Sequence, residues 1–141
     1  MKTPLWIPSE ERKRNANITR FGAVVNRRFG LSIRNYPELY QWSIENIAAF
    51  WETLWEFAKI RSSQRYTHVV DDLNKFPGAQ WFVGARLNFA ENLLRYRDDQ
   101  LAFVFKGETT KSATMTYAQL NATVARAAKS LRDLGVQPGD R

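Results

Sequence analysis

Residues 44–58 read "IENIAAFWETLWEFA", and this stretch carries the strongest periodic pattern in the chain. Apolar side chains recur at the three- and four-residue spacing of a helix, at Ile44, Ile47, Ala48, Trp51, Leu54, Trp55 and Ala58, with Phe50 and Phe57 widening the stripe. The opposite face carries three glutamates, Glu45, Glu52 and Glu56. The pattern predicts one amphipathic helix whose aromatic face packs into a core. We favour this interpretation over a platform that stacks nucleic-acid bases.

Three shorter helices are predicted before this stretch. Ser9, followed by two glutamates, is typical of an N-cap with an acidic first turn. Thr19 is expected to cap a second helix, which ends at Gly30 and has an apolar face of Phe21, Val24, Val25 and Phe29. Pro37 suits the first turn of a third helix, whose apolar face holds Leu39, Tyr40 and Trp42.

The segment after residue 60 has a weaker pattern. Residues 61–85 are predicted to be irregular, with a turn at Pro77-Gly78. Asn88, with Glu91 three residues later, forms a capping box that opens a short helix with Ala90, Leu93 and Leu94 turned inward.

The last third of the chain predicts a β-hairpin followed by a helix. The runs 101–105 and 113–117 have the composition and alternation of two strands, joined by the polar "KGETTKS". Thr116 and Gln119 form a second capping box. The helix that follows ends at Gly135 and has one apolar face, Leu120, Val124, Ala127, Ala128, Leu131 and Leu134.

This order of elements predicts an α+β fold in two parts. Residues 1–97 form a helical N-terminal region, and residues 98–141 form a hairpin and helix of the kind that begins an α/β sheet domain. Pro138-Gly139 then turns the chain toward what should be a further strand. We therefore expect the chain to be the front part of a larger protein.

Composition narrows the protein class. The 141 residues include no cysteine, which excludes a disulfide framework or a thiolate metal site and fits a reducing compartment. The start, "MKTPLWIPSEER", lacks the apolar region of a secretory signal, and no window approaches the length of a membrane span. We expect a cytoplasmic protein with no membrane partner.

The net charge of +7 is concentrated near the N-terminus. Residues 1–34 hold eight lysines and arginines against two glutamates, a local charge of +6. Such a cluster is compatible with a phosphate-binding or nucleic-acid-binding surface. Because the arginines alternate with a helical apolar stripe, we favour a solvated helix face or one that meets an acidic protein surface. A stand-alone basic helical module, binding nucleic acid or an acidic protein, is the alternative function.

Few residues could carry chemistry. His68 is the only histidine, so a site with two histidine ligands is impossible. Asp71 and Asp72 are adjacent, so in an extended chain they point to opposite faces and are expected to cap or form ion pairs. Neither glycine-rich phosphate motif is present. We predict no catalytic, cofactor-binding or metal-binding residue in this chain.

Four stretches together resemble the opening of acetoacetyl-CoA synthetases (acetoacetate–CoA ligases), which are adenylate-forming enzymes related to acetyl-CoA synthetase. They are "PLWIPSEERKRNANITRF", "YQWSIENIAAFWETLWEF", "VVDDLNKFPGAQWFVGARLNFAENLLRYRDDQLAFVFKGE" and "MTYAQLNATVARAAKSLRDLGVQPGDR". The most specific part is "WFVGARLNFAENLLRYRDDQ", residues 81–100. The resemblance covers essentially the whole chain.

The resemblance implies a reaction for a parent protein. ATP and acetoacetate would form an acyl-adenylate and pyrophosphate, and the thiol of CoA would then displace AMP. The family's phosphate loop, its adenylate motif and its late lysine all lie downstream of the residues present. ATP, Mg²⁺ and CoA are therefore implied for the parent only, and the chain itself is expected to be non-catalytic. Its expected partner is the remainder of the large domain, and exposed strand edges make self-association a further expectation.

Overall fold

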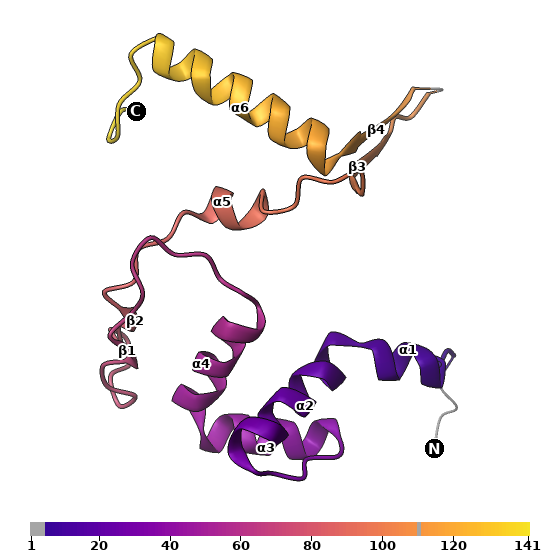
Figure 1. The fold of residues 1–141 in the computed structure, drawn as a ribbon, viewed down its shortest axis with the longest axis vertical. Coiled ribbons are helices and arrows are strands. Elements are labelled where there is room, and N and C mark those ends of the chain that lie inside the picture. The colour runs from indigo at the N-terminus through magenta and orange to yellow at the C-terminus, as the bar shows by residue number, and fades with distance from the viewer. Residues whose placement is uncertain (1–4, 110) are drawn as a thin grey trace. The chain divides into compact units, whose positions relative to one another are not determined.

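The computed structural model describes residues 5–109 and 111–141, and the chain divides into two compact units, Met1–Arg86 and Leu87–Arg141. Figure 1 shows their elements, and each unit is described separately below. Residues 1–4, at the start of the segment that was predicted not to be a secretory signal, and Thr110, in the predicted hairpin connection, lie outside the described residues. The predicted division at residues 97 and 98 concerns the domains of a longer protein and stays a prediction.

The predicted α+β fold is confirmed. In the first unit the described elements are the helices α1 (Glu10–Asn15), α2 (Asn17–Phe29), α3 (Tyr36–Glu45) and α4 (Ile47–Phe57) and the strands β1 (His68–Val70) and β2 (Trp81–Val83). In the second they are α5 (Phe89–Leu93), β3 (Leu101–Lys106), β4 (Ser112–Thr116) and α6 (Tyr117–Asp133). Each unit contains one two-stranded antiparallel sheet, β1-β2 or β3-β4.

The start of α1 and the end of α2 agree with the sequence prediction, but the start of α2 does not. Ser9 Oγ accepts a hydrogen bond from the Arg12 N–H at 3.2 Å, and Gly30 adopts the left-handed conformation at φ 66°. The predicted cap at Thr19 is wrong, because the N-cap of α2 is Ala16, three residues earlier. The Thr19 hydroxyl instead donates to the Lys13 carbonyl at 2.6 Å, so it satisfies the last turn of α1.

The single helix predicted over residues 44–58 is also wrong. The helix breaks at Asn46, whose φ of −126° and ψ of 51° lie outside the helical region, and Ile44 belongs to α3. The Asn46 side-chain amide donates to the Trp42 carbonyl at 3.1 Å, a local bond that competes with helix continuation. The apolar spacing runs through the break, which is why periodicity alone did not reveal it.

The core of the first unit lies between α2, α3 and α4. Its buried apolar side chains are Phe21, Val25 and Leu39, and the partly buried side chains packed against them are Ile33, Trp42, Phe50, Leu54 and Phe57. Phe21 makes edge-to-face contacts with Phe50 and Phe57, at centroid distances of 5.6 and 5.4 Å. The predicted role of the α4 aromatic face is therefore confirmed, although Trp51 stays 39% exposed.

A short β-hairpin covers the other aromatic side chains of α4, where the sequence predicted irregular structure apart from a strand-like segment around His68. His68 pairs with Val83 and Val70 with Trp81, and Pro77-Gly78 lies in the connection between the strands. Trp81 contacts Trp51 at 6.0 Å between ring centroids, and Phe82 contacts Trp55 at 4.6 Å. Phe82 has a φ of 49°, a conformation that L-residues rarely adopt and that long-range packing must stabilise.

In the second unit the hairpin, the N-cap at Asn88 and the capping box of Thr116 and Gln119 are confirmed. The Glu91 N–H donates to Asn88 Oδ1 at 3.1 Å, and Thr116 and Gln119 form a reciprocal capping box. The inward placement predicted for Ala90 and Leu93 is wrong, because both are exposed. On α6, Val124, Leu131 and Leu134 are 37%, 52% and 80% exposed, since one hairpin supplies too little surface to cover this face.

Candidate functional site

The described residues hold no group of three or more acidic or histidine side chains that could bind a metal ion. His68 lies exposed at the start of β1, with its Nδ1 3.0 Å from the Thr67 hydroxyl oxygen. The Thr67 hydroxyl also lies 3.2 Å from the Val83 carbonyl, across the hairpin. His68 therefore belongs to the edge of a small sheet.

The two adjacent aspartates organise the connection between β1 and β2. Asp71 forms an ion pair with Lys75 at 2.7 Å and accepts the Gln80 N–H at 2.8 Å. The hydrogen bond from Lys75, followed by that from the Gln80 N–H, lowers the pKa of Asp71 to about 2. Asp72 accepts the Asn74 N–H at 2.9 Å. The prediction that these residues cap or form ion pairs is confirmed.

Replacing Lys75 with methionine is expected to raise the pKa of Asp71 from about 2 toward its usual value of 3.8, because the largest cause of the shift is removed. Since the folded pKa lies below the usual value, this interaction stabilises the folded chain above about pH 4 and is lost as the pH falls from about 4 toward about 2. Titration of the Asp71 side-chain carboxyl signal by NMR measures the change. Lys129→Met, which removes the partner of Asp133 instead, is the matched control and should leave Asp71 unchanged. If the titration midpoint of the Asp71 carboxyl is the same in the Lys75→Met variant as in the unchanged chain, Lys75 is not the main cause of the lowered pKa.

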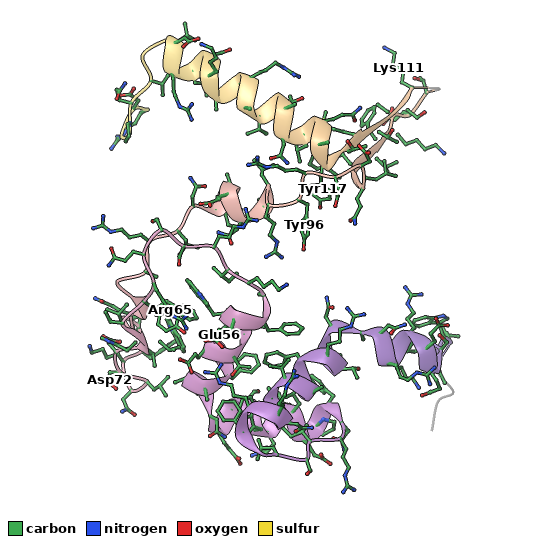
Figure 2. The ribbon with its side chains drawn as sticks, viewed as in Figure 1. Glu56, Arg65, Asp72, Tyr96, Lys111 and Tyr117 are labelled. Carbon is green, nitrogen blue, oxygen red and sulfur yellow. The ribbon has the colours of Figure 1, made fainter. Side chains whose placement is uncertain are left out.

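Part of the predicted basic cluster pairs with the acidic face of α4. Arg28 on α2 contacts Glu52 at 2.7 Å and Glu56 at 2.6 Å, and Arg65 contacts Glu56 at 2.9 Å. Figure 2 shows Glu56 and Arg65 on neighbouring segments. The hydrogen bond from Arg65, together with Arg28, lowers the pKa of Glu56. These pairs connect α2, α4 and the segment after α4, which supports a structural role for Arg28.

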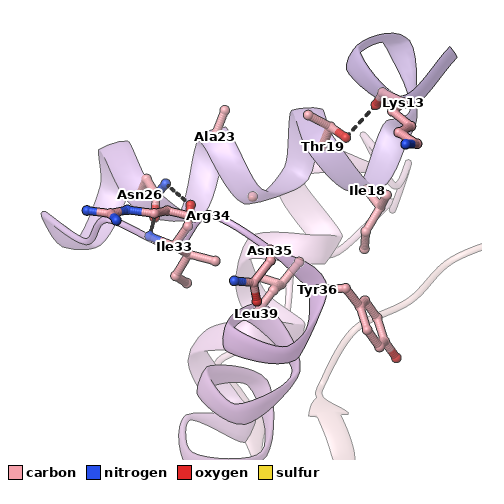
Figure 3. A pocket seen from close by; sticks show the side chains of 11 residues that line it. Lys13, Ile18, Thr19, Ala23, Asn26, Ile33, Arg34, Asn35, Tyr36 and Leu39 are labelled. Atoms are coloured by element: carbon pink, nitrogen blue, oxygen red, sulfur yellow. Dashed lines mark hydrogen bonds between the residues drawn. The ribbon is translucent and has the colours of Figure 1, made fainter. Parts of the chain in front are cut away.

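A groove runs between α2 and the segment that joins α2 to α3, as Figure 3 shows. It has a volume of about 510 Å³, and its apolar lining comes from Ile18, Gly22, Ala23, Ile33, Tyr36 and Leu39. The Asn26 amide fixes its wall, because it donates to the Ile33 carbonyl at 2.9 Å and accepts the Ile33 N–H at 2.8 Å. No pattern in the sequence predicted this groove.

Two of the lining residues, Gly22 and Arg34, affect the space in the groove and its charge. Gly22 lies inside α2, and a Cβ atom added there would meet no other atom within 4 Å, so the missing side chain leaves open space. Among the described residues, the Arg34 guanidinium has no hydrogen-bond or ion-pair partner, whereas Lys13 pairs with Glu10 at 2.6 Å. The lining is therefore mixed, because Lys13, Thr19, Asn26, Arg34 and Asn35 accompany the apolar side chains, and the Glu38 carboxylate accepts the Arg34 backbone N–H at 2.7 Å.

Comparisons with known proteins bear on the whole chain. Residues 36–93 match the family model described as "Acetyl-coenzyme A synthetase N-terminus". The acetoacetyl-CoA synthetase of Danio rerio is 39% identical over 140 residues, covering 97% of this chain and 20% of the relative. The malonamoyl-CoA synthetase of Penicillium aethiopicum is 39% identical over 124 residues, covering 83% of this chain and 17% of the relative. The solved structure of acetoacetyl-CoA synthetase from Streptomyces lividans is 41% identical with a TM-score of 0.85, over 99% of this chain and 22% of that chain.

These similarities place the chain in a class of proteins. Residues 36–93, which run from α3 to α5, are similar to the N-terminal region of acetyl-coenzyme A synthetases. Over nearly its whole length the chain is a homologue of acetoacetyl-CoA synthetases, and its α+β fold matches the start of one. The chain spans about one fifth of the length of these relatives.

Proposed function

We propose that this chain is the N-terminal part of an acetoacetate–CoA ligase. The parent reaction converts ATP, acetoacetate and CoA into AMP, pyrophosphate and acetoacetyl-CoA through an acyl-adenylate. The observation that carries the proposal is the 39–41% identity to acetoacetyl-CoA synthetases over nearly every residue of the chain. The remainder of the large domain is the expected partner, and the cytoplasm is the expected location.

The chain by itself is proposed to be non-catalytic. Transfer at a phosphate needs donors aimed at the developing charge and, in this class, a bound Mg²⁺. The described side chains include no group of three or more that could hold Mg²⁺. The 1–97 region would then be an extension that supports the adenylation domain, with residues 98–141 contributing the first hairpin and helix of that domain.

The acyl group handled by the parent needs a separate experiment. The Penicillium aethiopicum relative, at the same 39% identity, is named for malonamate, so similarity over this region does not discriminate between the two acids. The test is to express the complete gene and measure kcat/KM for acetoacetate, acetate and malonamate. A higher kcat/KM for acetoacetate than for the other acids supports the proposal. A gene that encodes no phosphate loop downstream of Arg141 contradicts it.

The alternative, a basic module that binds nucleic acid, has less support in the structure. Arg28 and Arg65 are engaged by glutamates of α4, so their charges are already paired. Binding of random RNA that weakens steeply with added salt would favour the module, because neutralised phosphates release counterions. We expect no such binding at physiological salt.

A further inference from the structure

The two units differ in the apolar surface that they bury. Within the described part of residues 87–141, which form the second unit, no residue is buried. The first unit buries four apolar residues to 8% exposure or less, Phe21, Val25, Leu39 and Val69. Removal of apolar surface from water is the main favourable term in folding, and it must offset the conformational entropy that the chain loses. The second unit therefore lacks the term that stabilises the first.

The local elements of the second unit do not replace a core. A single two-stranded hairpin is marginally stable in water. The helix α6 has 17 residues, close to the length of about 12–15 residues at which isolated helices are marginal. The Asn121 amide donates to the Tyr96 carbonyl at 2.7 Å and to the Tyr117 carbonyl at 2.9 Å. Such hydrogen bonds direct the geometry but add little net stability, because water competes for the same groups.

The hairpin and α6 nevertheless carry apolar surfaces that are typical of buried elements. In β3, Phe103 and Phe105 lie on one face and Val104 on the other, and these side chains are 57%, 59% and 70% exposed. A strand that is apolar on both faces is typical of a sheet that is covered on both sides. The stripe of α6 that includes Val124 and Leu131 is exposed as well. Since one helix can cover only one face of a hairpin, the second unit needs a further layer.

We propose that the second unit folds only when the remainder of the large domain packs against it, whereas the first unit folds on its own. The inference rests on the proposed function, because it takes the rest of the ligase as the partner. The length of the relatives favours this partner over an unrelated protein. The Streptomyces lividans structure contains the same fold, at a TM-score of 0.85, within a chain of which this one covers 22%. The second unit would then be an element whose folding is coupled to assembly of the large domain.

The direct test is hydrogen–deuterium exchange, measured by mass spectrometry on the purified chain and on the product of the complete gene. In this chain, peptides from β3, β4 and α6 should exchange within about tenfold of the rate of unfolded peptides, and in the complete protein at least about a hundredfold more slowly. Peptides from α2 and α4 should be protected in both samples and are the internal control. The concentration is one at which sedimentation shows this chain to be monomeric, so that a second copy does not supply the missing layer.

Three results would overturn the proposal. If α6 and the β3-β4 hairpin are as protected in the monomeric chain as in the complete protein, the second unit folds by itself. If they are unprotected in the complete protein, the large domain does not order them. If α2 and α4 exchange fast in this chain, the first unit does not fold alone. All five tryptophans belong to the first unit, so a cooperative urea transition in their fluorescence is a second measure of its folding.

A matched pair of variants tests which surface of α6 is covered. Val124→Asp places a charge on the apolar stripe, and Ala122→Asp places the same charge on an exposed position outside it. In the complete protein, Val124→Asp should abolish the protection of α6, because a charge buried without a partner is unfavourable, and Ala122→Asp should not. In this chain neither variant should change the exchange of α6. Equal effects of the two variants in the complete protein would contradict packing through the stripe.

The exchange measurement is independent of the proposed reaction, because it requires no turnover. A complete protein that protects α6 and the hairpin but has no ligase activity would contradict the proposed function and leave this inference standing. An active ligase whose first 141 residues protect α6 as well in isolation as in the complete protein would contradict this inference alone.

Discussion

Replacing Phe21 with alanine is expected to lower the free energy of unfolding of the first unit by about 3–5 kcal/mol. Phe21 is 3% exposed and touches both Phe50 and Phe57 of α4 edge to face, so its removal opens a cavity at the contact between α2 and α4. A unit of 86 residues has a net stability of roughly 4–13 kcal/mol, so the loss is a large part of the total. Urea unfolding followed by circular dichroism measures it.

Trp51→Ala is the informative comparison for this experiment. The sequence pattern makes Trp51 the centre of the aromatic face, but its side chain is 39% exposed, although it contacts the rings of Phe50 and Trp81. We therefore expect a loss clearly smaller than that of Phe21→Ala, about 1–2 kcal/mol. Equal losses would mean that the aromatic face, rather than the contact centred on Phe21, holds the unit together. An unfolding midpoint unchanged in Phe21→Ala would contradict the assigned core.

The purified chain is expected to show no acetoacetate-dependent exchange of labelled pyrophosphate into ATP. Enzymes of ordinary efficiency accelerate their reactions by about a millionfold or more, so the expected difference from a complete ligase is very large. Much of such a rate comes from holding the carboxylate and the α-phosphate in line, in a site whose donors face the developing charge. The sequence contains no glycine-rich phosphate loop that could provide those donors.

The assay combines purified chain, labelled pyrophosphate, ATP, Mg²⁺ and acetoacetate. A complete acetoacetyl-CoA synthetase serves as the positive control and a heat-treated sample of the chain as the blank. Light scattering on the same sample gives the mass of the assayed species, which relates any activity to monomer or dimer. Exchange above the blank that requires acetoacetate would show that an adenylation site exists within these 141 residues.

Local sequence signals predicted the ends of elements well in several places. Ser9, Asn88 and Thr116 cap helices as expected, and Gly30 and Gly135 adopt the left-handed conformation after α2 and α6. These features depend on hydrogen bonds between residues a few positions apart, so the sequence contains all the information they need. The wrong cap at Thr19 follows from the same rule, because Ala16 begins the helix without a side-chain hydrogen bond.

The candidate site was less accessible to sequence analysis. The ion-pairing or capping role of Asp71 could be predicted from its neighbours, since Lys75 lies four residues away. The groove could not, because it forms between α2 and the segment around Ile33, which the Asn26 amide holds in place. The only sign of the groove in the sequence was Gly22, a glycine inside the helical pattern of α2.

The sequence by itself determined the α+β class, the caps at Ser9, Asn88 and Thr116 and the β3-β4 hairpin, because periodicity and capping act over a few residues. Only the tertiary structure decided the break at Asn46, the β1-β2 hairpin and the centring of the core on Phe21. Strands of three residues have too few positions for alternation to be visible, and the left-handed Phe82 is stabilised by contacts with Trp55 and Tyr66, far away in the sequence. Burial likewise depends on which surfaces meet, and an apolar stripe specifies that a partner is needed without specifying which one.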